Sequence, residues 1–138
     1  MECSESKGIH QLLGDNMKIA IIGSRNFKRD SKIIAFLNKL KWDYTDNDGM
    51  CYLEIVTGGA IGVDKIAENW CKNHPYPIPC DVIRPINPSD KFSYLLRNVE
   101  ILTKADKVIA FWDGGSRGTK FGIDYAKARN KPIEVILQ

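Results

Sequence analysis

Two glycine-rich stretches with the same spacing are the residues best suited to chemistry in this sequence. Both have the form G-G-x-x-G, and they cover residues 58–62 and 114–118. Glycine lets backbone N–H groups approach a ligand closely because it has no Cβ, and a following helix adds unpaired N–H groups and a positive dipole end. The repeated spacing therefore predicts an anion site, most often for phosphate. Its candidate residues are Gly58, Gly59, Ala60, Gly62, Gly114, Gly115, Ser116, Arg117 and Gly118.

Three further polar residues follow apolar runs and can contact the same ligand. Ser24 and Arg25 come directly after Gly23, and an arginine offers a planar fork to phosphate or ribose. The alternative is that Arg25 is a surface arginine after a turn glycine. Thr119 follows the second loop and is either a helix cap or a hydroxyl donor to phosphate.

The spacing shows no nucleophile paired with a base. If a ligand is hydrolysed, carboxylates near the loops must act, and the candidates are Asp64, Asp113 and Asp124. Asp64 is otherwise an acid at a helix start, and Asp113 is otherwise an acceptor of backbone N–H bonds that orients the second loop. The cysteines have no C-x-x-C pairing, so we expect neither a metal site nor a cofactor.

Alternating apolar patterns indicate the elements that position these residues. Continuous apolar runs predict buried strands at 18–22, 53–57, 80–84, 108–112 and 133–137, and stripes at three- and four-residue spacing predict helices at 31–41, 63–70, 89–102 and 119–129. This alternation predicts an α/β fold: a Rossmann-like, doubly wound parallel sheet of about five strands with helices on both faces. The glycine loops would then meet at the carboxyl edge of the sheet.

The third predicted helix has a stripe that we expect to face the core. Its members are Phe92, Leu95, Leu96, Val99 and Leu102. Arg97 and Asn98 lie away from this stripe, and their positions alone predict a solvated face.

Length and composition indicate one domain of 138 residues. The regular pattern of apolar residues starts at Met17. Residues 1–16 are therefore predicted to be an N-terminal extension, either mobile or docked on the body or a partner, and residues 17–138 the domain.

The extension has no signal-peptide pattern and no apolar run is long enough for a bilayer, which predicts a cytoplasmic protein with no membrane partner. A net charge of +3 is small for a nucleic-acid binder, so nucleic acid is predicted to be an unlikely partner.

Four segments taken together resemble the SLOG superfamily, which includes the DprA/Smf proteins and the LOG phosphoribohydrolases. They are M-K-I-A-I-I-G-S-R (17–25), V-T-G-G-A-I-G-V-D (56–64), R-N (97–98) and A-D-K-V-I-A-F-W-D-G-G-S-R-G-T (105–119). The closest resemblance is to the small stand-alone YspA-like branch. It implies a homodimer or larger homo-oligomer with a nucleotide-derived ligand at the glycine loops. The pocket implied by these motifs uses Gly23, Ser24, Arg25, Gly58, Gly59, Asp64, Arg97, Asn98, Gly115, Ser116, Gly118 and Thr119.

One residue at which this chain departs from the family pattern decides between ligand binding and hydrolysis, the functions that the resemblance implies. The pattern of the LOG enzymes after the fourth strand is P-G-G-x-G-T-x-x-E. This chain has D-G-G-S-R-G-T-K-F-G at the corresponding place, without that glutamate. We therefore expect a protein that binds a nucleotide or ADP-ribose-like ligand, as a sensor, carrier or sequestering protein like SLOG domains of bacterial and phage conflict systems. The alternatives are a phosphoribohydrolase of nucleoside monophosphates and, disfavoured by the small charge, DprA-like binding of single-stranded DNA.

Overall fold

A computed structural model describes residues 16–138 of the chain. The predicted extension, residues 1–16, lies outside the described residues except for Asn16, so its boundary stays a prediction. In the described part, five strands form one sheet with the order β3-β2-β1-β4-β5, and every neighbouring pair is parallel. The strands are β1 (Met17–Gly23), β2 (Leu53–Thr57), β3 (Cys80–Val82), β4 (Lys107–Trp112) and β5 (Ile133–Leu137). The predicted fold class is confirmed.

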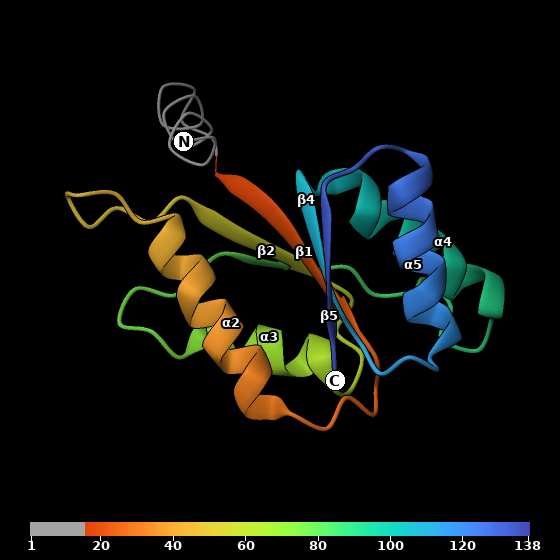
Figure 1. Ribbon diagram of the computed structural model, residues 1–138. Coiled ribbons are helices and arrows are strands. Elements are labelled where there is room, and N and C mark those ends of the chain that lie inside the picture. Colours follow the sequence, from red (N-terminus) through yellow and green to blue (C-terminus); the bar gives the residue numbers. More distant parts are fainter. Residues whose placement is uncertain (1–15) are drawn as a thin grey trace.

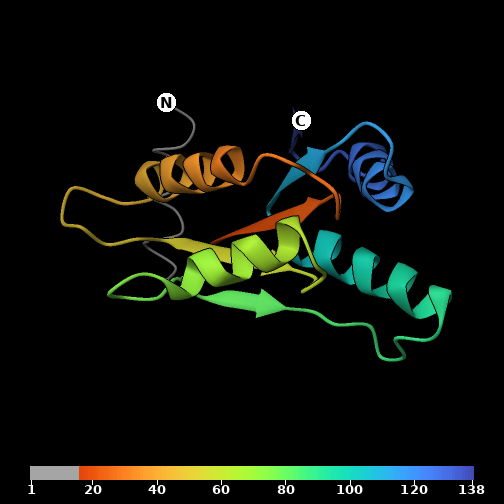
Figure 2. The same cartoon turned by 90° about the horizontal axis from the view of Figure 1, so that it is seen from below.

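Helices cover both faces of this sheet. They are α2 (Asp30–Asp43), α3 (Val63–Lys72), α4 (Lys91–Lys104) and α5 (Arg117–Ala128). Figure 1 shows α2 and α3 on one face and α4 and α5 on the other, and Figure 2 shows the same grouping from below. This two-sided cover explains why the strands are continuous apolar runs rather than alternating ones.

Each face of the sheet has its own apolar core. Ile19 and Ile21 of β1 belong to the core under α2 and α3, whereas Ala20 between them belongs to the core under α4 and α5. Phe111 of β4 is fully buried in the first core, where Phe27 and Phe36 meet its ring edge to face at 5.6 and 5.7 Å. These contacts fix the strands whose carboxyl ends carry the glycine loops.

The predicted core stripe of α4 is only partly right. Phe92, Leu95 and Leu96 are 61%, 40% and 51% exposed, whereas Leu102 is buried. The buried positions of the helix are Ser93, Arg97, Ile101 and Leu102. The helix is turned so that Arg97 faces the first glycine loop, where a carbonyl group accepts its hydrogen bond, and the solvated position expected from periodicity alone is wrong.

Candidate functional site

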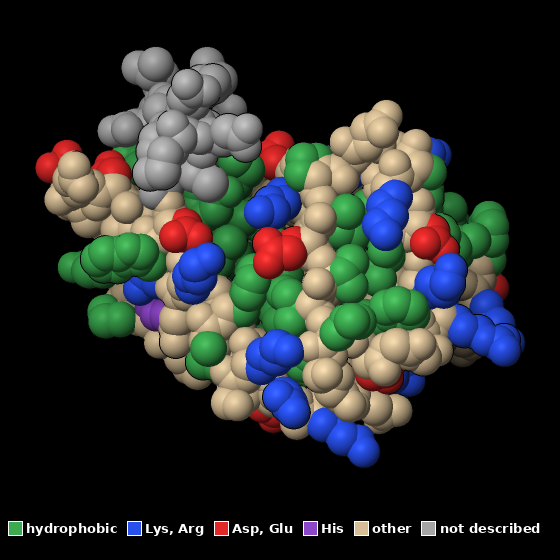
Figure 3. Space-filling view, in the orientation of Figure 1, with side chains coloured by type: hydrophobic (Ala, Val, Ile, Leu, Met, Phe, Trp, Pro, Cys, Tyr) green, Lys and Arg blue, Asp and Glu red, His purple; other side chains and the backbone are tan. Residues whose placement is uncertain are grey.

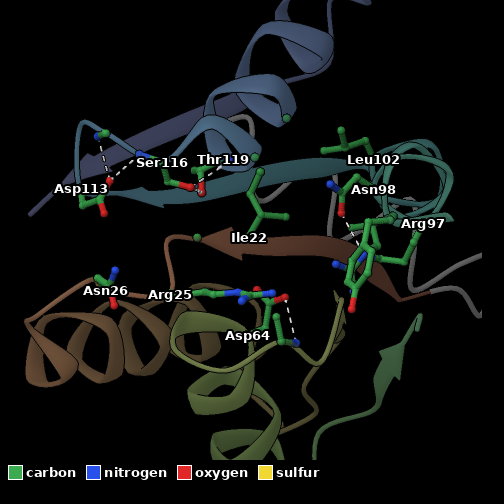
Figure 4. A pocket seen from close by; sticks show the side chains of 17 residues that line it. Ile22, Arg25, Asn26, Asp64, Arg97, Asn98, Leu102, Asp113, Ser116 and Thr119 are labelled. Carbon is green, nitrogen blue, oxygen red and sulfur yellow. Dashed lines mark hydrogen bonds between the residues drawn. The ribbon is translucent and has the colours of Figure 1, made fainter. Parts of the chain in front are cut away.

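A pocket of about 530 Å³ lies at the carboxyl edge of the sheet, beside the ends of β1 and β4 (Figure 4). The chain turns from β1 toward β2 on one side and places β4 on the other, so this is where the strand order reverses. Ligands of doubly wound sheets bind at such a switch point. The lining residues are Ile22, Gly23, Arg25, Asn26, Ala60, Asp64, Tyr94, Arg97, Asn98, Ile101, Leu102, Asp113, Gly115, Ser116, Gly118, Thr119 and Gly122.

Arg97 joins α4 to the first glycine loop. Its Nη1 donates to the carbonyl oxygen of Gly58 at 2.7 Å, and its Nε donates to Oδ1 of Asn98 at 2.9 Å. A Cβ at position 58 would lie 2.6 Å from Arg97 Nη1, so any other residue there has to displace the guanidinium from its hydrogen bond. Burial lowers the pKa of Arg97, but an arginine keeps its charge in proteins.

Asp64 lies in the first turn of α3 and lines the pocket beside the first loop. Its Oδ2 accepts a weak hydrogen bond from the backbone N–H of Ala60 at 3.4 Å, and the residue is 8% exposed. Burial raises the pKa of Asp64 to about 6, although the Ala60 hydrogen bond and the charge of Arg97 act in the opposite direction. The pocket therefore holds a carboxyl group that exchanges a proton near neutral pH.

The second glycine loop is held by its own aspartate. Oδ1 of Asp113 accepts the N–H groups of Gly115 and Ser116, both at 2.8 Å, and these bonds lower the pKa of Asp113. The interpretation of Asp113 as the residue that orients this loop is confirmed. Two of the amides expected to face a ligand are thus already bonded.

The start of α5 supplies the remaining donors. Ser116 is its N-cap, and Oγ of Ser116 accepts the N–H of Thr119 at 3.4 Å. The N–H groups of Arg117 and Gly118 make no hydrogen bond to any residue that the structure describes. They belong to the first helical turn, where backbone donors are left for an anion.

Arg25 is a cation of the pocket whose side chain is available to a ligand. It follows β1, is exposed, and forms no hydrogen bond or ion pair within residues 16–138. Arg25 lines the pocket, and Figure 4 shows its side chain extending along it. Arg25 and Arg97 are thus two positive charges against the carboxylates of Asp64 and Asp113.

Several predicted residues shape the site without lining it. Ser24 is buried, with its Oγ accepting the N–H of Asp113 at 3.1 Å and lying 3.5 Å from Oγ1 of Thr119. Gly59 and Gly62 adopt φ of 72° and 91°, which side chains other than glycine rarely adopt. Gly58, Gly114 and Arg117 are also absent from the lining residues.

Asp124 is not brought to the pocket. It lies on the exposed side of α5, where Lys120 Nζ donates to its Oδ2 at 2.8 Å. Of the three candidate catalytic carboxylates, only Asp64 and Asp113 line the cavity.

Sequence reasoning missed part of the lining: Ile22, Asn26, Tyr94, Ile101, Leu102 and Gly122. Helical spacing is a signal for one of them, because Tyr94 precedes Arg97 by three residues and Asn98 by four, and so shares their side of α4. Gly122 is also close-packed, since a Cβ there would lie 2.7 Å from Cδ1 of Ile22. Nothing in the apolar run of β1 marks Ile22 as a pocket residue.

Neither a metal-binding cluster nor a membrane span is found among residues 16–138. No group of three or more His, Cys, Asp or Glu side chains is placed to hold a metal ion there. No helix in this part of the chain is both long and apolar enough to cross a bilayer.

The chain is similar to a solved structure of DNA processing protein A (DprA) from Helicobacter pylori. The TM-score is 0.66 at 26% sequence identity, and the match covers 93% of this chain and 68% of that one. That protein is described as having a unique single-stranded DNA binding mode. Comparisons with protein-family models and with curated proteins give no match.

This likeness supports the resemblance to the SLOG superfamily, to which the DprA/Smf proteins belong, but not the YspA-like branch, which stays a prediction. It also corrects one expectation. Nucleic acid was predicted to be an unlikely partner because the net charge is only +3, whereas the structural neighbour binds single-stranded DNA. That prediction is wrong, because net charge averages over the whole surface and does not report the few cations that face a pocket.

Proposed function

We propose that this chain binds single-stranded DNA, with one nucleotide unit of the strand seated in the pocket between β1 and β4. The observation that carries the proposal is the position of this pocket, which brings Arg25 and the helix-start amides of α5 together at the switch point of a fold shared with DNA processing protein A. Residues 17–138 form the binding domain in this proposal.

The donors of the pocket suit a phosphodiester group. Arg25 has no competing partner among the described residues, and Gly118, which lines the pocket, has a free N–H group at the start of α5. A phosphate at this helix start accepts charge-assisted hydrogen bonds and a favourable dipole interaction.

The direct test is fluorescence anisotropy of a labelled oligo(dT) of about 12 nucleotides, a length within the site sizes of single-strand binders. We expect Arg25→Ala to weaken binding by about 1.5–3 kcal/mol, or about 10- to 150-fold, because it removes a charge-assisted contact. The matched control is Lys127→Ala, which removes the same charge from the exposed far end of α5. Equal affinities of parent and Arg25→Ala would contradict the proposed phosphate contact.

A second candidate is a free nucleotide or ADP-ribose-like molecule, which the chain would sense, carry or sequester. The size of the pocket favours it, since a cavity of about 530 Å³ over buried apolar side chains is of the size that small ligands occupy. Asp64, with its pKa raised to about 6, also has the acidity of a general acid or base near neutral pH. Cleavage of a nucleoside monophosphate to its base is therefore part of this candidate.

Two measurements separate the candidates. A DNA strand that releases counterions from about three phosphates gives a slope of about −2 in a plot of log affinity against log salt, and a mononucleotide gives a smaller one. Chromatography of nucleoside monophosphates incubated with the protein detects any free base. Tight binding of mononucleotides, with no gain in affinity for the longer strand, would favour the second candidate.

A further inference from the structure

The pocket has two chemically different halves. One half contains Arg25, Ser116 and Thr119 with the start of α5, and the other has an apolar floor of Ile101 and Leu102, each 2% exposed. Figure 4 shows Leu102 and Asn98 on the side of the pocket away from Asp113 and Ser116. Polar atoms for a phosphate and an apolar surface for a ring are thus present in one cavity.

The apolar half is closed on one side by α5, where Gly122 lets Ile22 pack against the helix. A Cβ at Gly122 would lie 2.7 Å from Cδ1 of Ile22 and 3.9 Å from Cδ1 of Leu102, so these apolar side chains already fill that place and form the wall. The ring of Tyr94 also lines this half, and the Arg97 guanidinium lies 5.3 Å from its centroid. Apolar side chains and an aromatic ring are the surfaces against which nucleobases pack.

Asn98 is the polar residue of this half, and its amide has a fixed orientation. Nε of Arg97 donates to Oδ1 of Asn98 at 2.9 Å, while Nη1 of Arg97 is anchored on Gly58 at 2.7 Å. The amide oxygen is therefore held toward the buried cation. The Asn98 amide nitrogen has no hydrogen-bond partner among the described residues, so its N–H groups are available to a ligand.

We infer that the apolar half is a nucleobase site in which Asn98 selects a base with a carbonyl acceptor over adenine. The inference rests on the proposed function and adds the choice of base to it. Thymine presents carbonyl oxygens, whereas adenine has none and places its N6 amino donor beside N7. The hydrogen bond to Arg97 turns the Asn98 oxygen toward that guanidinium, so it is not placed to accept the adenine amino group, and the usual two-bond match between asparagine and adenine is disfavoured.

The test compares oligo(dT) with oligo(dA), each of about 12 nucleotides, on the parent, Asn98→Ala and Asn98→Asp. The quantity is the Kd for oligo(dA) divided by the Kd for oligo(dT), because self-stacking of each strand cancels when this ratio is compared between variants. We expect the ratio to fall by about 2- to 12-fold in Asn98→Ala, the usual net effect of losing one neutral hydrogen bond. In Asn98→Asp it falls further, because a carboxylate oxygen then faces the base and accepts from the adenine amino group.

Two controls keep the result specific. Thr103→Asp adds the same charge on an exposed position of α4 outside the pocket, and we expect it to leave the ratio unchanged. Oligo(dI) against oligo(dA) on the parent protein exchanges the amino group for a carbonyl on the same purine ring, and we expect oligo(dI) to bind more tightly. This comparison uses only the parent protein, so its result does not depend on whether a variant folds.

An unchanged ratio in both Asn98 variants, or equal binding of oligo(dI) and oligo(dA), would overturn the role of Asn98 while leaving DNA binding intact. No binding of any of these strands to folded parent protein would overturn the proposed function, and this inference with it.

Discussion

Arg97 shows what a single residue reveals about the site. Helical periodicity places it on the solvated side of α4, yet it is only 9% exposed and bonded to Gly58. Periodicity describes how a helix meets its core, but it contains no information about a loop that approaches from another part of the chain. The motif R-N (97–98), compared with a known family, pointed to the pocket where the pattern of apolar residues did not.

The buried carboxyl group of Asp64 makes the stability of the fold depend on pH. Folding raises the pKa of Asp64 from 3.8 to about 6, so the folded state binds more protons than the unfolded state between these values. Asp64 therefore stabilises the fold most below about pH 4, and this contribution, about 3 kcal/mol, is lost as the pH rises through 6. We expect Asp64→Asn to remove this part of the pH dependence of the free energy of unfolding.

Urea unfolding at about pH 4 and about pH 7.5 measures this effect. The matched control is Asp124→Asn, an exposed carboxylate on α5, which we expect to follow the parent. Parallel pH profiles for the parent and Asp64→Asn would contradict the burial argument for Asp64.

At the scale of elements, the strands and the alternation of strand and helix could be predicted because two-sided burial leaves continuous apolar runs. The place of the two glycine loops at one edge also followed, since parallel strands end on the same side. The different roles of the loops could not be predicted from their common spacing. Gly58 has no room for a Cβ because Arg97 fills the space, whereas Gly115 has only Asp113 Oδ1 at 3.8 Å and no positive φ.

This difference predicts opposite results for two alanine substitutions. Gly58→Ala is expected to destabilise the fold by about 1–3 kcal/mol, because its Cβ overlaps the guanidinium of Arg97, and to weaken ligand binding with it. Gly115→Ala is expected to change stability by less than about 0.5 kcal/mol, so any loss of binding there reports blocked approach of the ligand. Thermal unfolding and oligo(dT) anisotropy of both variants check this, and equal destabilisation by the two changes would contradict it.

At the scale of the whole molecule, one face of the surface mixes charged and apolar groups. Figure 3 shows Lys and Arg side chains together with Asp, Glu and apolar side chains over the face in view. A second cavity, of about 770 Å³, is lined by residues of α2 and of the loops before β2 and β3, including Trp42 and Tyr76, which are 79% and 90% exposed. Exposed aromatic rings also stack with bases, so this cavity is the natural competitor of the pocket between β1 and β4.

The most direct test of the account is an NMR titration of the full chain with oligo(dT) of about 12 nucleotides, following backbone amides. We predict that the largest shifts occur at Ala60, Ser116 and Gly118, which line the pocket, and that Gly49 and Cys51 at the second cavity stay unchanged. Large shifts at Gly49 and Cys51, with Ala60, Ser116 and Gly118 unmoved, would contradict the central claim that the strand binds between β1 and β4.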